Sequence, residues 1–187
     1  MTGTELKQRT ASLGFRSGVP DVRLFYDSAN LALAEVNRIR PLKKRLTFRV
    51  HGGETVELTA LEGGASVTGI IRHKLHTDLS DGAPAASSAV TASPEIIGTS
   101  VVIPEGVSGT LECLCYRRPV ALDADTMELP LDVDPVLGEL LPLLVASYLW
   151  RDDYPDYASA YREEFDAACH RLPVSLCGAD TVTTNGW

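Results

Sequence analysis

The sequence predicts an α+β fold in which a helical bundle carries an inserted small β-sandwich or barrel. Two observations predict it. Apolar residues recur at three- and four-residue steps over residues 21–40 and again over 134–172, as in helices with one apolar face. Between these segments, residues 46–116 contain about five short alternating or β-branched runs separated by glycine-rich turns, a pattern that favours antiparallel hairpins. The helices are therefore expected at both ends of the chain and the strands in the middle.

These patterns divide the 187 residues into a core, an insertion and a tail. We expect residues 1–45 and 120–173 to form the helical core, 46–119 the β-rich insertion and 174–187 an extended C-terminal tail. Residues 80–94 are rich in alanine and serine, which predicts a long, exposed and mobile loop within the insertion. A chain of this length is large enough for one domain with a real core that carries such an insertion.

Two helices are expected near the N-terminal end. The first covers residues 4–15, with Thr4 as its cap. The second begins after Asp21, a good capping residue, and ends before Pro41, because a proline disfavours helical geometry in the residue before it. The apolar stripe of this second helix consists of Val22, Phe25, Ala29, Leu33, Val36 and Ile39.

The strands of the insertion follow from its alternating runs. Five are expected, at residues 46–50, 55–59, 66–71, 96–103 and 110–116. In the last of them Cys113 and Cys115 are alternate residues, so their side chains point to the same face.

The segment from Glu128 to Phe165 is the most informative part of the sequence. Asp134 caps a helix that has Pro135 at its first position. We expect Pro142 either to restart this helix after a short turn or to kink it. An acidic turn follows, and then a second helix whose apolar stripe consists of Ala158, Tyr161, Phe165, Ala168 and Leu172. The two helices make a hairpin, which Pro173 ends.

The net charge of −8 argues against nucleic-acid binding through a broad basic surface. One local basic strip covers residues 38–45, and its Arg40, Lys43 and Lys44 are candidate partner-binding residues. The alternative is a solvated helix end, because cations are favourable at helix C-termini.

No membrane segment or signal peptide is expected. The N-terminal residues lack the apolar region of a signal peptide. The longest apolar run, residues 140–150, contains Pro142 and is much shorter than the roughly 20 residues of a membrane span. We therefore expect a soluble protein that is made inside a cell.

The sequence predicts no metal site. Asp152 and Asp153 lack the spacing of a calcium loop, and acidic residues here are favourable at the start of the following helix. His73 and His76 would face opposite sides of a strand.

We also predict no enzyme activity and no cofactor. The four cysteines, Cys113, Cys115, Cys169 and Cys177, lack zinc spacing with His170, and we interpret them as buried free thiols. The sequence contains no nucleophile elbow and no glycine-rich phosphate loop between a strand and a helix.

Three sequence features resemble the phage head–tail connector (adaptor) proteins. The run FYDSANLALAEV at 25–36 is similar to the opening helix of that family. The run GTLECLCYRRP at 109–119 resembles the exit from its β insertion. The run LLPLLVASYLWRDDYPDYASAYREEF, preceded by Glu128-Leu-Pro-Leu131, resembles its closing helix pair.

The resemblance implies a structural virion protein, made in the host cytoplasm and located at the head–tail interface. Copies of the chain would form a ring, typically twelve-fold, beneath the portal protein, and would provide the surface for a tail or stopper protein. DNA would pass through the lumen without specific binding, which an acidic inner wall would suit. Tails in this family often contact the portal, and Val182 and Trp187 are the corresponding candidate partner-binding residues here. A tail without fixed structure is the alternative.

A different virion component is the alternative function. In a tail-completion or baseplate protein the β insertion would bind carbohydrate. Small β-sandwiches usually do so through exposed aromatic residues, and the insertion contains only Phe48 and Tyr116.

Overall fold

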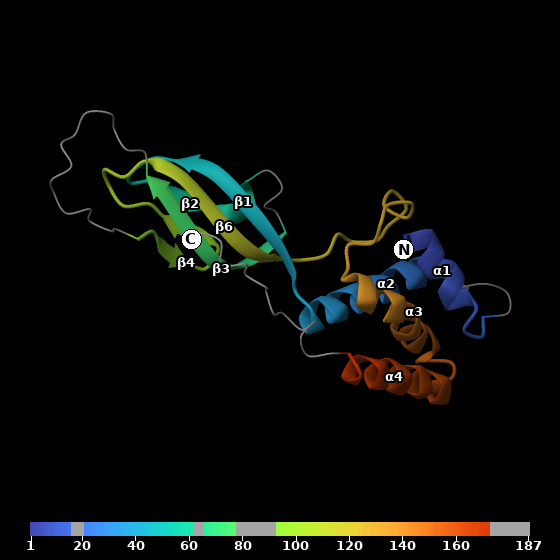
Figure 1. The fold of residues 1–187 in the computed structure, drawn as a ribbon. Helices are drawn as coiled ribbons and strands as arrows, with labels where there is room; N and C mark the ends of the chain where they lie inside the picture. The colour runs from blue at the N-terminus through green and yellow to red at the C-terminus, as the bar shows by residue number, and fades with distance from the viewer. Residues whose placement is uncertain (16–20, 62–65, 78–92, 173–187) are drawn as a thin grey trace. The chain divides into compact units, whose positions relative to one another are not determined.

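A computed structural model of the chain describes residues 1–15, 21–61, 66–77 and 93–172 (Figure 1). These residues form four α-helices and two small antiparallel sheets, which confirms the predicted α+β class. The chain divides into two compact units. The helical unit consists of residues 1–41 and 119–187, and the β unit of residues 42–118. None of the described helices is long and apolar enough to span a membrane.

The helical unit contains α1 (Gly3–Ala11), α2 (Val22–Ile39), α3 (Pro135–Trp150) and α4 (Pro155–His170). Helix α3 packs against each of the other three helices and lies between α2 and α4 in Figure 1. All four contribute to one apolar core. Its largest fully buried side chains are Leu6, Phe25, Leu33, Val36, Leu137, Leu141, Leu144 and Phe165.

Helix α1 differs from its prediction at both ends. It begins at Gly3 and ends at Ala11, and its cap is Thr2 rather than Thr4. The Thr2 hydroxyl accepts a hydrogen bond from the Glu5 amide at 3.2 Å, and the Glu5 carboxylate accepts one from the Thr2 amide at 3.0 Å. This capping box needs an acceptor three residues after the cap, which Thr2 finds in Glu5. Thr4 would meet Lys7 at that position, and a lysine side chain only donates.

Helix α2 matches its prediction closely. The Asp21 carboxylate caps it by accepting a hydrogen bond from the Arg23 amide at 2.7 Å. The predicted stripe is buried in its middle, at Phe25, Ala29, Leu33 and Val36, and exposed at its two ends, Val22 and Ile39.

Helix α3 is continuous, so the prediction that Pro142 restarts it is wrong. Asp134 caps the helix as expected, with its carboxylate 3.0 and 3.2 Å from the amides of Val136 and Leu137. A proline inside a helix costs roughly 3 kcal/mol. Pro142 and its neighbours Leu141 and Leu144 are buried, and burial of a single leucine contributes about 1.5–3 kcal/mol, so packing offsets the cost.

Helix α4 begins at Pro155 after the expected turn and ends at His170. Of its predicted stripe, Ala158 and Phe165 are buried, whereas Tyr161, Ala168 and Leu172 are partly exposed. Pro173 and the tail 174–187 lie outside the described residues.

The β unit contains six described strands in two three-stranded antiparallel sheets, ordered β1-β6-β3 and β2-β5-β4. The bounds are β1 Leu42–Val50, β2 Thr55–Glu57, β3 Val67–Thr77, β4 Glu95–Ile97, β5 Ser100–Val102 and β6 Gly109–Arg117. Its apolar core consists of Leu46, Val50, Val56, Leu58, Val67, Val101, Ile103, Leu111, Cys113 and Cys115.

Four predicted strands differ from the observed ones, and the second of them, expected over 55–59, ends at Glu57 before a 3₁₀ helix over Leu58–Ala60. The first starts at Leu42 rather than at residue 46, and the third continues to Thr77. The run 96–103 is two strands, because Gly98 adopts a left-handed conformation, with φ +64°, and reverses the chain between β4 and β5. Most of the predicted loop 80–94 lies outside the described residues.

Candidate functional site

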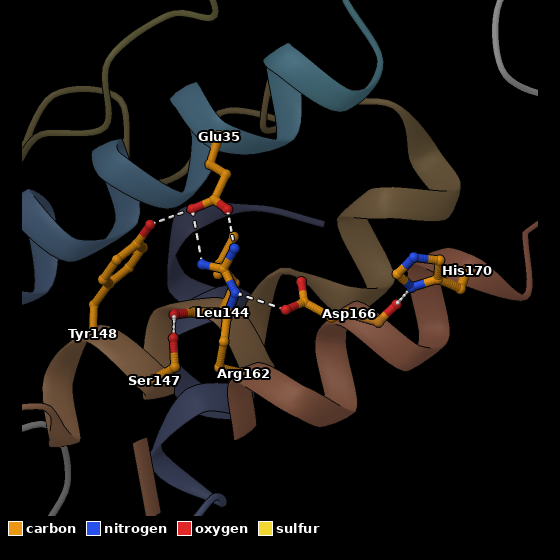
Figure 2. A network of polar contacts seen from close by, with 7 residues as sticks. All are labelled: Glu35, Leu144, Ser147, Tyr148, Arg162, Asp166 and His170. Carbon is orange, nitrogen blue, oxygen red and sulfur yellow. Dashed lines mark hydrogen bonds and ion pairs between the residues drawn. The ribbon is translucent and has the colours of Figure 1, made fainter. Parts of the chain in front are cut away.

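A network of polar side chains joins three helices of the helical unit (Figure 2). Glu35 on α2 accepts a hydrogen bond from the hydroxyl of Tyr148 on α3 and forms an ion pair with Arg162 on α4. The second guanidinium contact, from Arg162 Nη1 to Glu35 Oε2, measures 3.1 Å. Arg162 also reaches Asp166, one turn further along α4, with 3.1 Å between Nε and Oδ2.

The electrostatics of this network favour a fixed ion pair over acid–base chemistry. Burial alone would raise the pKa of Glu35, but hydrogen bonds from Arg162 and Tyr148 outweigh it, and the pKa lies below the ordinary value. Burial and the Glu35 carboxylate raise the pKa of Tyr148. A general base should instead have a pKa near the working pH. The network is therefore suited to holding α2, α3 and α4 together.

The described residues contain no group of three or more histidine, cysteine, aspartate or glutamate side chains that could hold a metal ion. His73 and His76 both lie on β3, and His76 Nε2 is 3.7 Å from the Glu112 carboxylate on β6. This pair supplies two possible ligands, fewer than the three or four of a protein zinc site.

The cysteines of the β unit have the surroundings of unreactive thiols. Cys113 and Cys115 are both fully buried, as predicted. Desolvation, with a smaller contribution from Cys115, raises the pKa of Cys113 to about 12, and desolvation also raises the pKa of Cys115. Cys169 on α4 is half-buried, and Cys177 lies outside the described residues. A buried thiol with a raised pKa has little of the reactive thiolate.

Of the basic strip 38–45, Arg38 is an exposed cation in the last turn of α2, as in a solvated helix end, but the other residues differ from that alternative. Arg40 is the C-cap of α2, but its side chain is only 6% exposed and its Nη1 lies 3.0 Å from Asp134 Oδ1, which also caps α3. Lys43 and Lys44 lie on β1, half-buried, and both make polar contacts. The strip is thus divided between a buried helix cap and a strand. The other candidates, Val182 and Trp187, lie outside the described residues.

The first of two unpredicted surfaces is an apolar groove between the start of α3 and the end of α4. Its volume is about 510 Å³, and it is lined by Pro135, Val136, Glu139, Leu140, Ala168, Arg171 and Leu172. Two of the lining side chains are charged. Glu139 is paired with Arg9 of α1, whereas the exposed side chain of Arg171 has no ion-pair partner among the described residues. The groove is therefore an apolar surface with the Arg171 guanidinium, which has no ion-pair partner in the described part of the chain, at its edge.

The second surface, the aromatic patch, lies at the turn between α3 and α4. Trp150 stacks on Phe15 with ring centroids 4.3 Å apart, and it meets Tyr154 and Tyr157 edge-on at 5.1 and 5.8 Å. Tyr154 and Tyr157 stack on each other at 5.7 Å and remain 55% and 57% exposed. Tyr161 lines the same hollow, whose volume is about 500 Å³.

Hydrogen bonds fix the base of this patch. The Leu13 carbonyl accepts hydrogen bonds from Trp150 Nε1 at 3.3 Å and from the Tyr161 hydroxyl at 2.7 Å. Gly14 follows with φ +104°, and a side chain there would approach the Trp150 ring. Two exposed carboxylates of the turn, Asp153 and Asp156, have no ion-pair partner among the described residues. The patch therefore combines fixed aromatic rings with available negative charge.

The sequence contains a signal for the aromatic patch but none for the groove. Tyr154 and Tyr157 are three residues apart across Pro155, and two aromatic residues are an unusual feature in a turn with several aspartates. Val136 and Leu140 lie four residues apart on a helix that is apolar on most sides, so nothing in the pattern separates the groove from the core.

Comparison with known proteins adds no family. Neither a scan against protein-family models nor a search of curated proteins finds a match to this chain. The function must therefore be inferred from the chain's own residues.

Proposed function

We propose that this chain is a structural phage adaptor that forms a ring beneath the portal at the head–tail interface. Its finer architecture would be a helical bundle with an inserted small β-sandwich or barrel. In this proposal the chain contacts copies of itself, the portal protein and a tail or stopper protein. It carries out no chemistry of its own.

The single observation that supports this proposal most is the discontinuous helical unit. The chain leaves it at residue 41 and returns at residue 119, after the complete β unit. Two pairs of contacts join the outgoing and returning segments. Asn30 and the Leu122 backbone exchange hydrogen bonds of 3.0 and 2.7 Å, and Arg40 pairs with Asp134. This is the chain order that the resemblance to the connector proteins implies.

The character of the helical surface also favours an assembly protein over an enzyme. The groove and the aromatic patch are apolar or aromatic, with charges at their edges, as in the centre and rim of protein–protein interfaces. Aromatic side chains and arginine are the residues most enriched in such interfaces. The net charge of −8 is compatible with a lumen through which DNA passes without being held.

Electron microscopy of intact virions tests the proposal. Gold-labelled antibodies raised against the purified chain should mark the vertex where the head joins the tail. Particles assembled without the chain should accumulate as filled heads separate from tails. Label on the capsid or along the tail, or normal assembly in its absence, would contradict the proposed function.

A second candidate is carbohydrate binding by the β unit of a tail-completion or baseplate protein. The observation in its favour is Tyr116 on β6, an aromatic side chain that is 39% exposed. Glycan-array binding by the full chain, lost in Tyr116→Ala, would support it. An array without binding would exclude carbohydrates of the kinds it carries.

A further inference from the structure

We infer that copies of this chain associate head to tail, with the aromatic patch of one copy seated in the apolar groove of the next. This inference rests on the proposed ring and names the two surfaces that build it. The patch is defined by Phe15, Trp150, Tyr154 and Tyr157, and the groove by Pro135, Val136, Leu140, Ala168 and Leu172, with Arg171 at its edge.

The positions of the two surfaces favour this arrangement. Helices α3 and α4 each contain 16 residues and form one hairpin. The patch lies at its turn, and the groove lies at its open end, between the start of α3 and the end of α4. A helix of this length spans about 24 Å. Both surfaces therefore belong to one packed element but lie at its opposite ends, so each can contact a different neighbour, as a heterologous contact requires.

The chemistry of the two surfaces is complementary. Tyr154 and Tyr157 expose more than half of their area, although they are the kind of aromatic side chain that dominates binding energy when buried at an interface. The groove offers about 510 Å³ lined mostly by apolar side chains, within the range that holds a compact ligand group. An aromatic anchor in an apolar groove is the usual centre of a protein interface.

The charges at the two edges are opposite. Asp153 and Asp156 beside the patch and Arg171 beside the groove lack ion-pair partners among the described residues. Seating the patch in the groove would bring these carboxylates toward the guanidinium, which also stacks favourably on tyrosine rings. Two copies of the patch would instead bring like charges together, which disfavours patch-to-patch contact.

Successive contacts of this kind join each copy to two neighbours. They close into a ring when the rotation between copies divides a full turn, and otherwise continue as a filament. A symmetric dimer would use the same surface on both copies and would stop at two. The number of copies in the assembly therefore distinguishes these arrangements.

Sedimentation equilibrium of the full chain tests the inference. The wild-type chain, studied from about 10 μM to 1 mM, should form assemblies larger than dimers as concentration rises. Val136→Asp on the groove and Tyr157→Ser on the patch should each weaken association roughly tenfold or more. Arg23→Glu, a charge change at an exposed position of α2 that lines neither hollow, serves as the control and should leave association unchanged. A strictly monomeric wild-type chain, or variants that associate normally, would overturn the inference.

A charge exchange tests the pairing of the two edges. Arg171→Glu and Asp153→Arg should each weaken association, and the double variant should recover most of it, because the ion pair is restored with its sign reversed. Equal losses in the single and double variants would overturn the assigned pairing.

A mixture of the groove variant and the patch variant tests the head-to-tail contact most directly. Val136→Asp keeps an intact patch, and Tyr157→Ser keeps an intact groove. A mixture of the two should therefore form heterodimers and stop there. Larger assemblies, or no association in the mixture, would contradict a head-to-tail contact.

A crosslink tests the same contact without weakening the association between copies. Benzoylphenylalanine in place of the exposed Tyr157 should, under ultraviolet light, join to residues 135–140 or 168–172 of another copy, as mass spectrometry would identify. Crosslinks to other regions would overturn the inference. If the contact fails while antibody label remains at the head–tail vertex, the proposed function still stands. If the contact holds in a chain absent from virions, the proposed function fails instead.

Discussion

The two units of this chain are stabilised in different ways. The helical unit brings together segments far apart in sequence and holds three helices with the Glu35–Arg162–Tyr148 network. The β unit is one continuous stretch, and the side chains at the centre of its sheets are apolar. One polar cluster of the β unit is exposed, where the single carboxylate of Glu57 accepts hydrogen bonds from three hydroxyl side chains.

This difference has a physical consequence. Apolar burial depends on area and tolerates small rearrangements, whereas a partly buried ion pair depends on geometry and on the charge of each member. The helical unit should therefore respond to acid and to charge changes at its partly buried ion pair, and the β unit most strongly to loss of core volume. The exposed Glu57, whose pKa is lowered by hydrogen bonds from Ser100, Thr99 and Thr59, also gives the β unit an acid-sensitive group. Three predictions test this contrast, and a fourth tests the α1 cap within the helical unit.

Core truncation should have the largest effect, and it should be confined to one unit at a time. Phe165→Ala in the helical unit should cost about 3–5 kcal/mol and Leu111→Ala in the β unit about 2–5 kcal/mol, because both side chains are fully buried. Hydrogen exchange followed by mass spectrometry reports the stability of each unit separately. If either variant lowers protection equally in both units, the two units unfold as one and the contrast fails.

Acid should weaken the helical unit through Glu35. Its pKa in the folded chain lies below its ordinary value of 4.5, so the unfolded chain takes up the proton first. The stability from this charge is complete well above pH 4.5 and is lost as pH falls through the lower, folded pKa. Denaturant unfolding of the helical unit between pH 7 and pH 3 measures this loss, which should be smaller in Glu35→Gln.

The same variant has an effect at neutral pH. Glu35→Gln leaves Arg162 with Asp166 as its remaining carboxylate partner, and should cost roughly 1–2 kcal/mol, because solvent reaches part of the pair. Tyr148→Phe is the matched control. It removes one of the hydrogen bonds that lower the pKa of Glu35 and keeps the ion pair, so its loss of stability in acid should lie between those of the wild type and Glu35→Gln. An unchanged pH profile in Glu35→Gln would show that Glu35 does not set the acid response.

Loss of the α1 cap should have the smallest effect. Thr2→Ala removes the hydroxyl that accepts the Glu5 amide and should cost about 1 kcal/mol. Thr4→Ala is the control. It removes one exposed hydrogen bond to Glu128, and alanine is favourable inside a helix, so its cost should be smaller. Denaturant midpoints compare the two, and a larger loss in Thr4→Ala would contradict the assignment of the cap.

Local signals in the sequence were sufficient to predict where a helix starts when it begins with a strong capping residue. Asp21 and Asp134 each predicted a helix start, and both carboxylates accept the expected amide hydrogen bonds. The prediction that Pro142 restarts α3 was wrong because the local cost of the proline is outweighed by burial, which depends on the whole core. Gly98 was missed because a short hairpin and a single strand contain similar β-branched residues, and only the backbone conformation distinguishes them.

The candidate surfaces were harder to predict than the fold. Arg40 belongs to a run of basic residues that indicates an exposed strip, but its partner Asp134 lies 94 residues away in sequence. The groove forms where the start of α3 meets the end of α4, so no single stretch of sequence contains it. The aromatic patch was closer to prediction, since its tyrosines lie within one turn, but its contact with Phe15 is again distant in sequence.

The divided helical unit also fixes an order of events during synthesis. Helices α1 and α2 leave the ribosome roughly a hundred residues before α3, an interval of about 5–20 seconds at ordinary translation rates. Throughout this interval Leu6, Phe25 and Leu33 lack the helix against which they pack. The β unit needs only residues 42–118, so it can complete its sheets first. The N-terminal helices must therefore stay unaggregated on the nascent chain until Asn30 meets Leu122 and the last hairpin emerges.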